Sequence, residues 1–131
     1  MSMPHLSLAY WCVLIAALLP YVSAYIAKAG AFKGSDNQKP REWVARQAGW
    51  RARANSSQAN GFEGLPFFIG AVIIAHQLGA AQARLDMLAA AYVLLRLVYI
   101  GVYIAGLGTI RSTVWALAFF VNVAILFAGR Q

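Results

Sequence analysis

Four long stretches of apolar residues alternate with polar segments along the chain, at residues 6–27, 62–78, 85–107 and 111–127. A helix rises about 1.5 Å per residue, so about 17 to 25 apolar residues cross the hydrocarbon core of a bilayer. The pattern therefore predicts an all-α fold: an integral membrane four-helix bundle with four transmembrane helices per subunit, in a single domain over residues 1–131.

The first connection, residues 28–53, is long and basic. It holds seven lysines and arginines against two acidic residues. Cytoplasmic loops of membrane proteins carry an excess of Lys and Arg, so we expect this loop in the cytoplasm and both termini on the opposite side. Pro40 is suited to start a helix at Arg41 that runs on into the second span. Residues 106–108, Gly-Leu-Gly, are expected to form a tight turn.

Composition agrees with a membrane location. Hydrophobic residues make up 61% of the chain and charged residues 11%, against roughly one half and one quarter in soluble proteins. A net charge of +7 is also found in nucleic-acid-binding proteins, but most of it lies in one loop, so no nucleic acid partner is expected. No metal site is expected, because His5 and His76 have no partner at ligand spacing.

A polar stripe leads into the second span, within residues 53–68. At about 100° per residue, five polar side chains lie within about 120° of one another on a helix: Arg53, Ser56, Ser57, Asn60 and Glu63. An ionised carboxylate is costly in hydrocarbon, so an intramembrane Glu is a functional-site hypothesis by default. We expect the stripe to face a water-filled site, a ligand or another helix rather than lipid.

The third and fourth spans carry matching polar positions. Tyr92, Arg96, Tyr99 and Tyr103 follow a spacing of four, three and four residues, which places them on one helix face. The fourth span begins with Arg111-Ser112, and the same face continues through Trp115 and Asn122. Three helices are thus predicted to line a cytoplasm-facing pocket rich in Arg and Tyr. Such a pocket suits a small anionic ligand that also carries an amine, because Arg binds carboxylates through paired hydrogen bonds. A lipophilic partner can enter from the bilayer.

Several of these residues also have structural explanations. Glu63 and Arg96 can form a buried ion pair that fixes the helix register. Arg111 can extend its charge to the membrane surface at the end of its span, and Asn60 can link two helices by hydrogen bonds. The tyrosines can be packing residues whose hydroxyls find partners, an explanation we prefer for Tyr92.

Three short patterns, taken together, resemble the MAPEG superfamily, the membrane-associated proteins of eicosanoid and glutathione metabolism. They occur in order on the second, third and fourth spans: Arg53-Ala54 with Asn60-x-x-Glu63 and Pro66, Arg96 with Tyr103, and Arg111-Ser112. The resemblance covers nearly the whole chain, including the long basic first loop. It implies a homotrimer of four-helix subunits that binds glutathione between neighbouring subunits on the cytoplasmic side.

The resemblance also implies residue roles. Arg111 and Ser112 would act on the sulfur of glutathione as the catalytic residues, since a nearby guanidinium lowers the pKa of a thiol. The expected glutathione-binding residues are Arg53, Asn60, Glu63, Arg96, Tyr99, Tyr103 and Trp115. The prostaglandin E synthases of the superfamily differ: they have arginines where this chain has Ser56 and Ala59, a histidine in place of Tyr99 and a tyrosine in place of Trp115. The eicosanoid activities are therefore not carried over.

The favoured hypothesis is a membrane-bound, glutathione-dependent transferase or peroxidase that acts on lipophilic electrophiles through an arginine-stabilised thiolate. Its expected partners are glutathione as co-substrate, a lipophilic small molecule, membrane lipid and two further copies of the chain. One alternative is a MAPEG-like binding protein without catalysis. Another is a small four-span transporter that uses Glu63 as a proton or cation site, although Arg96, Arg111 and the basic loop would repel a cationic substrate.

Overall fold

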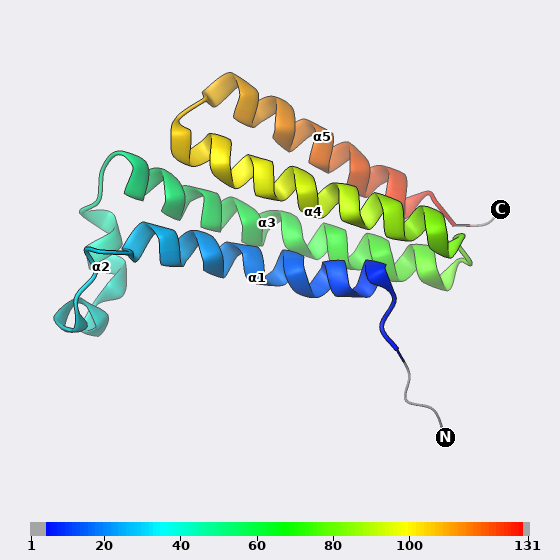
Figure 1. The fold of residues 1–131 in the computed structure, drawn as a ribbon, viewed down its shortest axis with the longest axis horizontal. Coiled ribbons are helices and arrows are strands. Elements are labelled where there is room, and N and C mark those ends of the chain that lie inside the picture. Colours follow the sequence, from blue (N-terminus) through cyan, green and yellow to red (C-terminus); the bar gives the residue numbers. More distant parts are fainter. Residues whose placement is uncertain (1–4, 130–131) are drawn as a thin grey trace.

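The structure is a computed structural model that describes residues 5–129. Its elements are α1 (Leu8–Lys28), the short 3-10 helix η1 (Gly34–Gln38), α2 (Pro40–Ala45), α3 (Trp50–Gln77), α4 (Gln82–Ala105) and α5 (Gly108–Leu126) (Figure 1). Four of these helices are long and apolar enough to cross a membrane, with mean hydropathies from 1.2 to 2.0. The all-α, four-span fold predicted from the apolar pattern is confirmed.

The long helices lie side by side along their lengths (Figure 1). α1 packs against α3 and α4, and α5 packs against α4 and α3. The connection that contains η1 and α2 and the turn between α4 and α5 lie at one end of the bundle, which we call the turn end. The start of α1 and the end of α5 lie at the opposite end.

The second transmembrane helix starts earlier than its apolar stretch. The expected span 62–78 lies inside α3, which begins at Trp50. The expectation that a helix from Arg41 runs on into this span is wrong, because α2 ends at Ala45 and the chain turns at Gly49. Gly49 has a φ of 66°, a conformation that glycine adopts at little cost. In the polar first turns of α3, two arginines find partners at the ends of neighbouring helices.

Arginines of α3 provide the first of these contacts. Arg51 Nη1 donates hydrogen bonds to the carbonyls of Ala27 and Ala29, over 2.9 and 2.7 Å, at the end of α1. Arg53 Nε donates to the carbonyl of Ile104, over 2.9 Å, at the end of α4. The last carbonyls of a helix have no partner within the helix, and a cation there is favoured by the helix dipole. Both arginines therefore hold helix ends together at the turn end.

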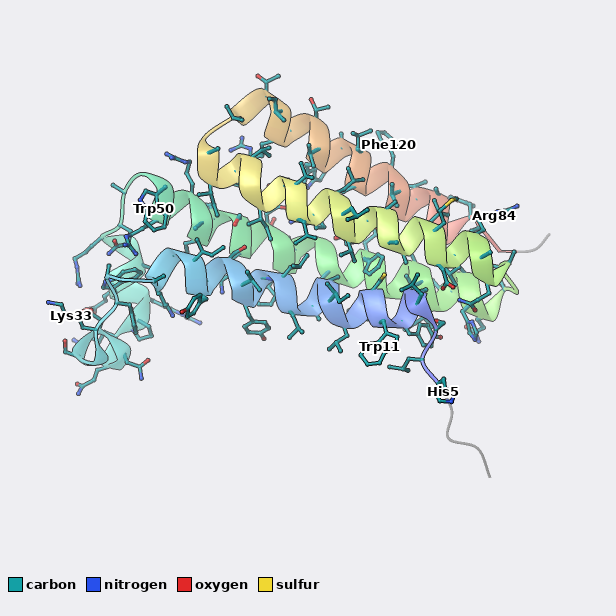
Figure 2. The ribbon with its side chains drawn as sticks, viewed as in Figure 1. His5, Trp11, Lys33, Trp50, Arg84 and Phe120 are labelled. Carbon is teal, nitrogen blue, oxygen red and sulfur yellow. The ribbon has the colours of Figure 1, made fainter. Side chains whose placement is uncertain are left out.

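Small residues fill much of the space between the helices, which brings the helix backbones close. Phe68, from α3, is fully buried and stacks on Tyr92, from α4, with ring centroids 4.2 Å apart. Buried small residues of the core come from four helices: Ala9, Ala16, Ala71, Ala75, Ala89 and Ala118. Large apolar side chains such as Trp11 and Phe120 point outward from the bundle (Figure 2), as expected for a surface in contact with lipid.

Candidate functional site

Two adjoining cavities open among α3, α4 and α5. One, the turn-side cavity, has a volume of about 260 Å³ and is lined by Asn60, Tyr99, Tyr103, Arg111, Ser112 and Trp115. All six of these residues belong to the site predicted from sequence. They come from three helices, and the α4–α5 turn positions the tyrosines of α4 beside the first turn of α5.

The other, the central cavity, also has a volume of about 260 Å³. Its lining comes from the same three helices and comprises Asn60, Glu63, Gly64 and Phe67 of α3, Tyr92 and Arg96 of α4, and Trp115, Ala118, Phe119 and Asn122 of α5. Asn60 and Trp115 line both cavities, so the two adjoin, and we call them together the hollow.

Arg96 is the buried charge of this hollow. Its side chain is only 5% exposed. Its Nη2 donates one hydrogen bond, to Asn60 Oδ1 over 3.0 Å, and its guanidinium carbon lies 4.2 Å from the ring centroid of Tyr99. Burying an ion is expensive unless an opposite charge compensates it. Arg96 is therefore suited to bind an anionic group.

The ion pair considered between Glu63 and Arg96 is not formed. Within residues 5–129, the ion pairs of the structure join Lys39 to Glu42 and Asp36 to Arg46, in the connection between α1 and α3. The Glu63 side chain is exposed and lines the central cavity. A cation can reach its carboxylate from the cavity.

The two arginines of the hollow are joined by a row of aromatic rings. The Arg96 guanidinium lies on the Tyr99 ring, the Tyr99 ring meets the Tyr103 ring edge-on at 5.5 Å, and the Arg111 guanidinium lies 4.7 Å from the Tyr103 centroid. Stacking on a ring holds a guanidinium plane in place and leaves its N–H groups at the edge free to donate. This row orients two sets of cationic donors toward the same hollow.

Arg53 is the one predicted site residue that lines neither cavity. Its Nε donates a hydrogen bond to the Ile104 carbonyl. Its guanidinium packs against Gly106, 3.5 Å from the position that a Cβ on Gly106 would take. These contacts tie the start of α3 to the end of α4, which is a structural role. Because one helix face includes both Arg53 and Asn60, periodicity alone could not separate the two.

Sequence reasoning missed the apolar part of the lining. Phe67 and Phe119 were not singled out, although both line the central cavity and their ring centroids lie 5.6 Å apart. In an apolar span, the sequence does not distinguish a phenylalanine that lines a cavity from one that faces lipid. Tyr92, interpreted as a packing residue, both stacks on Phe68 and lines the central cavity. Asn122, which the sequence placed on the same face of the fourth span as Trp115, does line the central cavity.

A third cavity, with a volume of about 10 Å³, lies on the α1 side of Arg96. It is lined in part by Ser23, Ser57 and Arg96. Ser23 is fully buried, and its Oγ has no hydrogen-bond partner within the described residues.

No group of three or more His, Cys, Asp or Glu side chains within residues 5–129 is arranged to hold a metal ion. The chemistry of the hollow is that of guanidinium, tyrosine, amide and carboxylate groups.

The fold and the hollow define a class: a multi-pass membrane protein with four spans and an arginine-containing, aromatic-lined hollow among α3, α4 and α5. A family model described as "MAPEG family" matches residues 8–130, and the chain belongs to this family. The resemblance found in the sequence patterns is thereby confirmed. Family membership supports a membrane-associated, glutathione- or eicosanoid-related function in general. No curated protein and no solved structure matches the chain.

Proposed function

We propose that the protein is a membrane-bound, glutathione-dependent transferase or peroxidase for lipophilic electrophiles. The observation that carries this proposal is the pair of arginines, Arg96 and Arg111, joined through two tyrosine rings and directed into one hollow. Neither arginine has an acidic partner within 4.0 Å among residues 5–129. Membership of the MAPEG family supports glutathione as the thiol co-substrate.

Glutathione has two carboxylates, one ammonium group and a thiol, and the hollow has complementary groups. Arg96 is suited to one carboxylate, because a guanidinium binds a carboxylate through two parallel hydrogen bonds. Glu63, free of an ion pair, is suited to the ammonium group. Asn60 lies in the wall common to both cavities, where its amide nitrogen can donate to the peptide carbonyls.

Arg111 and Ser112 are the proposed catalytic residues, at the turn end of the hollow. A guanidinium near the sulfur favours the thiolate over the thiol, and the Ser112 hydroxyl can donate a hydrogen bond to it. In a transfer reaction the thiolate forms a carbon–sulfur bond and the electrophile's leaving group departs with its electron pair. In a peroxidase reaction the thiolate attacks a peroxide oxygen and the O–O bond breaks. The alcohol leaves with a proton, and a second glutathione then gives the disulfide and water.

The proposed assembly is a homotrimer, and the proposed orientation puts the turn end in the cytoplasm. The basic connection of residues 28–53 lies at that end together with Arg111, and an excess of Lys and Arg marks cytoplasmic loops. Family membership supports sites between neighbouring subunits. Lipid would surround the outward-facing side chains, and the lipophilic substrate would come from the bilayer.

The test is stopped-flow absorbance in the thiolate band after mixing detergent-purified protein with glutathione near neutral pH. We expect a saturable thiolate signal in the wild-type protein and its loss in Arg111→Ala. Arg84→Ala is the matched control, because Arg84 is exposed at the opposite end of the bundle (Figure 2) and should keep the signal. Folded wild-type protein without a thiolate signal would contradict the catalytic proposal. Glutathione binding without turnover of any electrophile would favour the binding-protein alternative.

A further inference from the structure

The connection between α1 and α3 folds into a small unit at the turn end, which we call the basic cap (residues 28–49; Figure 1). Trp43 of α2 is 5% exposed, and its ring meets the Phe32 ring edge-on, with centroids 5.1 Å apart. The Asp36 carboxylate accepts a hydrogen bond from the backbone N–H of Lys33 over 2.9 Å. These contacts order the cap before any ligand binds, so binding costs less entropy than it would for a disordered loop.

The cap carries more cations than its own acidic residues can neutralise. Glu42 lies 4.0 Å from Lys39, and Asp36 lies 3.7 Å from Arg46. Three further cations of the cap have no acidic side chain within 4.0 Å among residues 5–129: Lys28, Lys33 and Arg41. Lys33 and Arg41 are exposed. An anion at the surface of the cap can therefore reach cations that no acidic residue in the described part of the chain neutralises.

The cap also lies at the level where a bilayer has its headgroups. Tyr21 and Tyr25, one turn apart near the end of α1, are 61% and 75% exposed, and exposed tyrosines near a span end are typical of the membrane–water interface. Lys28 follows Tyr25 by three residues, roughly 4.5 Å along the helix, and its Nζ lies 4.7 Å from the Phe32 centroid. The cap extends beyond α1 on the side toward which Trp11 points (Figure 2). A lipid beside this face of α1 would therefore have its headgroup next to the cap.

We propose that the basic cap binds the headgroup of an anionic phospholipid. Lys33 and Arg41 supply cations for its phosphate, and its acyl chains lie along exposed apolar side chains of α1, such as Leu14 and Leu18. A phospholipid with a net negative charge satisfies these cations, whereas the choline group of a zwitterionic lipid brings a positive charge to the same surface. The position of the cap at the end of a span favours a lipid over a soluble polyanion. The site lies outside the hollow and does not depend on the proposed function.

Native mass spectrometry of the detergent-purified full-length protein tests this selectivity by counting bound lipids. The probes are dioleoylphosphatidylglycerol, which is anionic, and dioleoylphosphatidylcholine, which has the same acyl chains and no net charge. We expect the first phosphatidylglycerol per subunit to bind about fivefold more tightly than the first phosphatidylcholine, the effect of one cation near an anionic headgroup. The preference should fall as the concentration of ammonium acetate rises, because salt screens exposed charges.

Four variants locate the preference. Arg41→Gln should lower the affinity for phosphatidylglycerol, Lys33→Gln/Arg41→Gln should reduce it to that for phosphatidylcholine, and neither should change the affinity for phosphatidylcholine. Arg41→Lys keeps the charge and should retain most of the preference. Arg84→Gln is the matched control for Arg41→Gln, since it removes the same charge from an exposed residue at the opposite end of the bundle (Figure 2), and it should behave as wild type. All of these side chains are exposed, so the substitutions should have little effect on folding.

Equal wild-type affinities for the two lipids would overturn the proposal. So would a preference that survives in the double variant, or an equal loss in Arg84→Gln, because either would place the preference outside the cap. Equal lipid affinities together with tight binding of a polyglutamate peptide would assign the cap to an acidic protein partner instead. These measurements contain no thiol and change no residue of the hollow, so failure here and failure of the thiolate experiment are distinguishable.

Discussion

Replacing Arg96 by methionine separates a ligand-binding arginine from a structural one. Arg96 is 5% exposed, and its guanidinium donates one hydrogen bond to Asn60 over 3.0 Å and lies 4.2 Å from the Tyr99 centroid. Loss of a hydrogen bond from a charged group costs about 1.5–3 kcal/mol, and loss of the cation–π contact costs about 0.5–2 kcal/mol. Methionine fills a similar volume and removes the desolvation penalty of a buried ion, which is of the order of several kcal/mol.

These contributions offset one another in the ligand-free protein. We expect the unfolding midpoint of Arg96→Met, without glutathione, to stay within about 4 °C of the wild type, which corresponds to roughly 1 kcal/mol for a chain of this size. Glutathione binding should respond very differently. Removing one partner of a buried charge pair costs about 2–5 kcal/mol, which lowers the affinity about 30-fold or more.

The assay is thermal unfolding of detergent-purified protein with and without glutathione, together with equilibrium dialysis of labelled glutathione. Wild-type protein should be stabilised by the ligand and Arg96→Met should not. Arg84→Met, an exposed position at the far end of the bundle, should match the wild type in both measurements. The reasoning is refuted if Arg96→Met unfolds far below the wild type, as after breaking a buried network, yet binds glutathione normally.

Three further predictions concern residues that pack the helices around the hollow. Arg53→Ala removes the hydrogen bond to the Ile104 carbonyl near the end of α4 and should lower stability by about 1–3 kcal/mol, with little change in glutathione affinity by dialysis. A weaker affinity at unchanged stability would instead make Arg53 a ligand contact. Gly61→Ala adds a Cβ 3.0 Å from a side-chain carbon of α1 and should cost about 1–3 kcal/mol in thermal unfolding. Gly70→Ala is its matched control, since its Cβ meets nothing within 4 Å, and it should be neutral or stabilising by up to about 1 kcal/mol; equal effects of the two would argue against close packing at Gly61. Ser23→Ala deletes a buried hydroxyl without a protein partner and should leave the midpoint unchanged or raise it, whereas a marked fall would show that a bound water holds the site together.

Local spacing accounts for most of the site. A polar residue in an apolar helix selects a face, and helical periodicity determines which polar residues share that face. Asn60 and Glu63, three positions apart, line the central cavity together, and Tyr99 and Tyr103, four positions apart, line the turn-side cavity together. The prediction that three helices line a pocket follows from these faces and from short connections. α3, α4 and α5 each contribute to both cavities, while the cytoplasmic orientation stays a prediction.

Spacing could not predict which residues on a face reach the hollow. Arg53 shares its face with Asn60 but lies beside the end of α4, so it binds the Ile104 carbonyl. The sequence places Glu63 and Arg96 at depths in the membrane that are compatible with an ion pair. The register of α3 against α4 places Asn60 at the guanidinium and leaves the carboxylate facing the cavity.

The sequence by itself determined the number of spans, their approximate positions and the polar faces, because the bilayer requires long apolar helices and the helix repeat relates neighbours within each of them. Only the tertiary structure decided that α3 begins at Trp50, that Arg96 has an amide and a ring as partners instead of an acid, and that Asn122 faces a cavity. The physical reason is that each of these depends on contacts between helices. Small residues set how closely the helices approach, and a shift of one residue in register would exchange every partner across the interface.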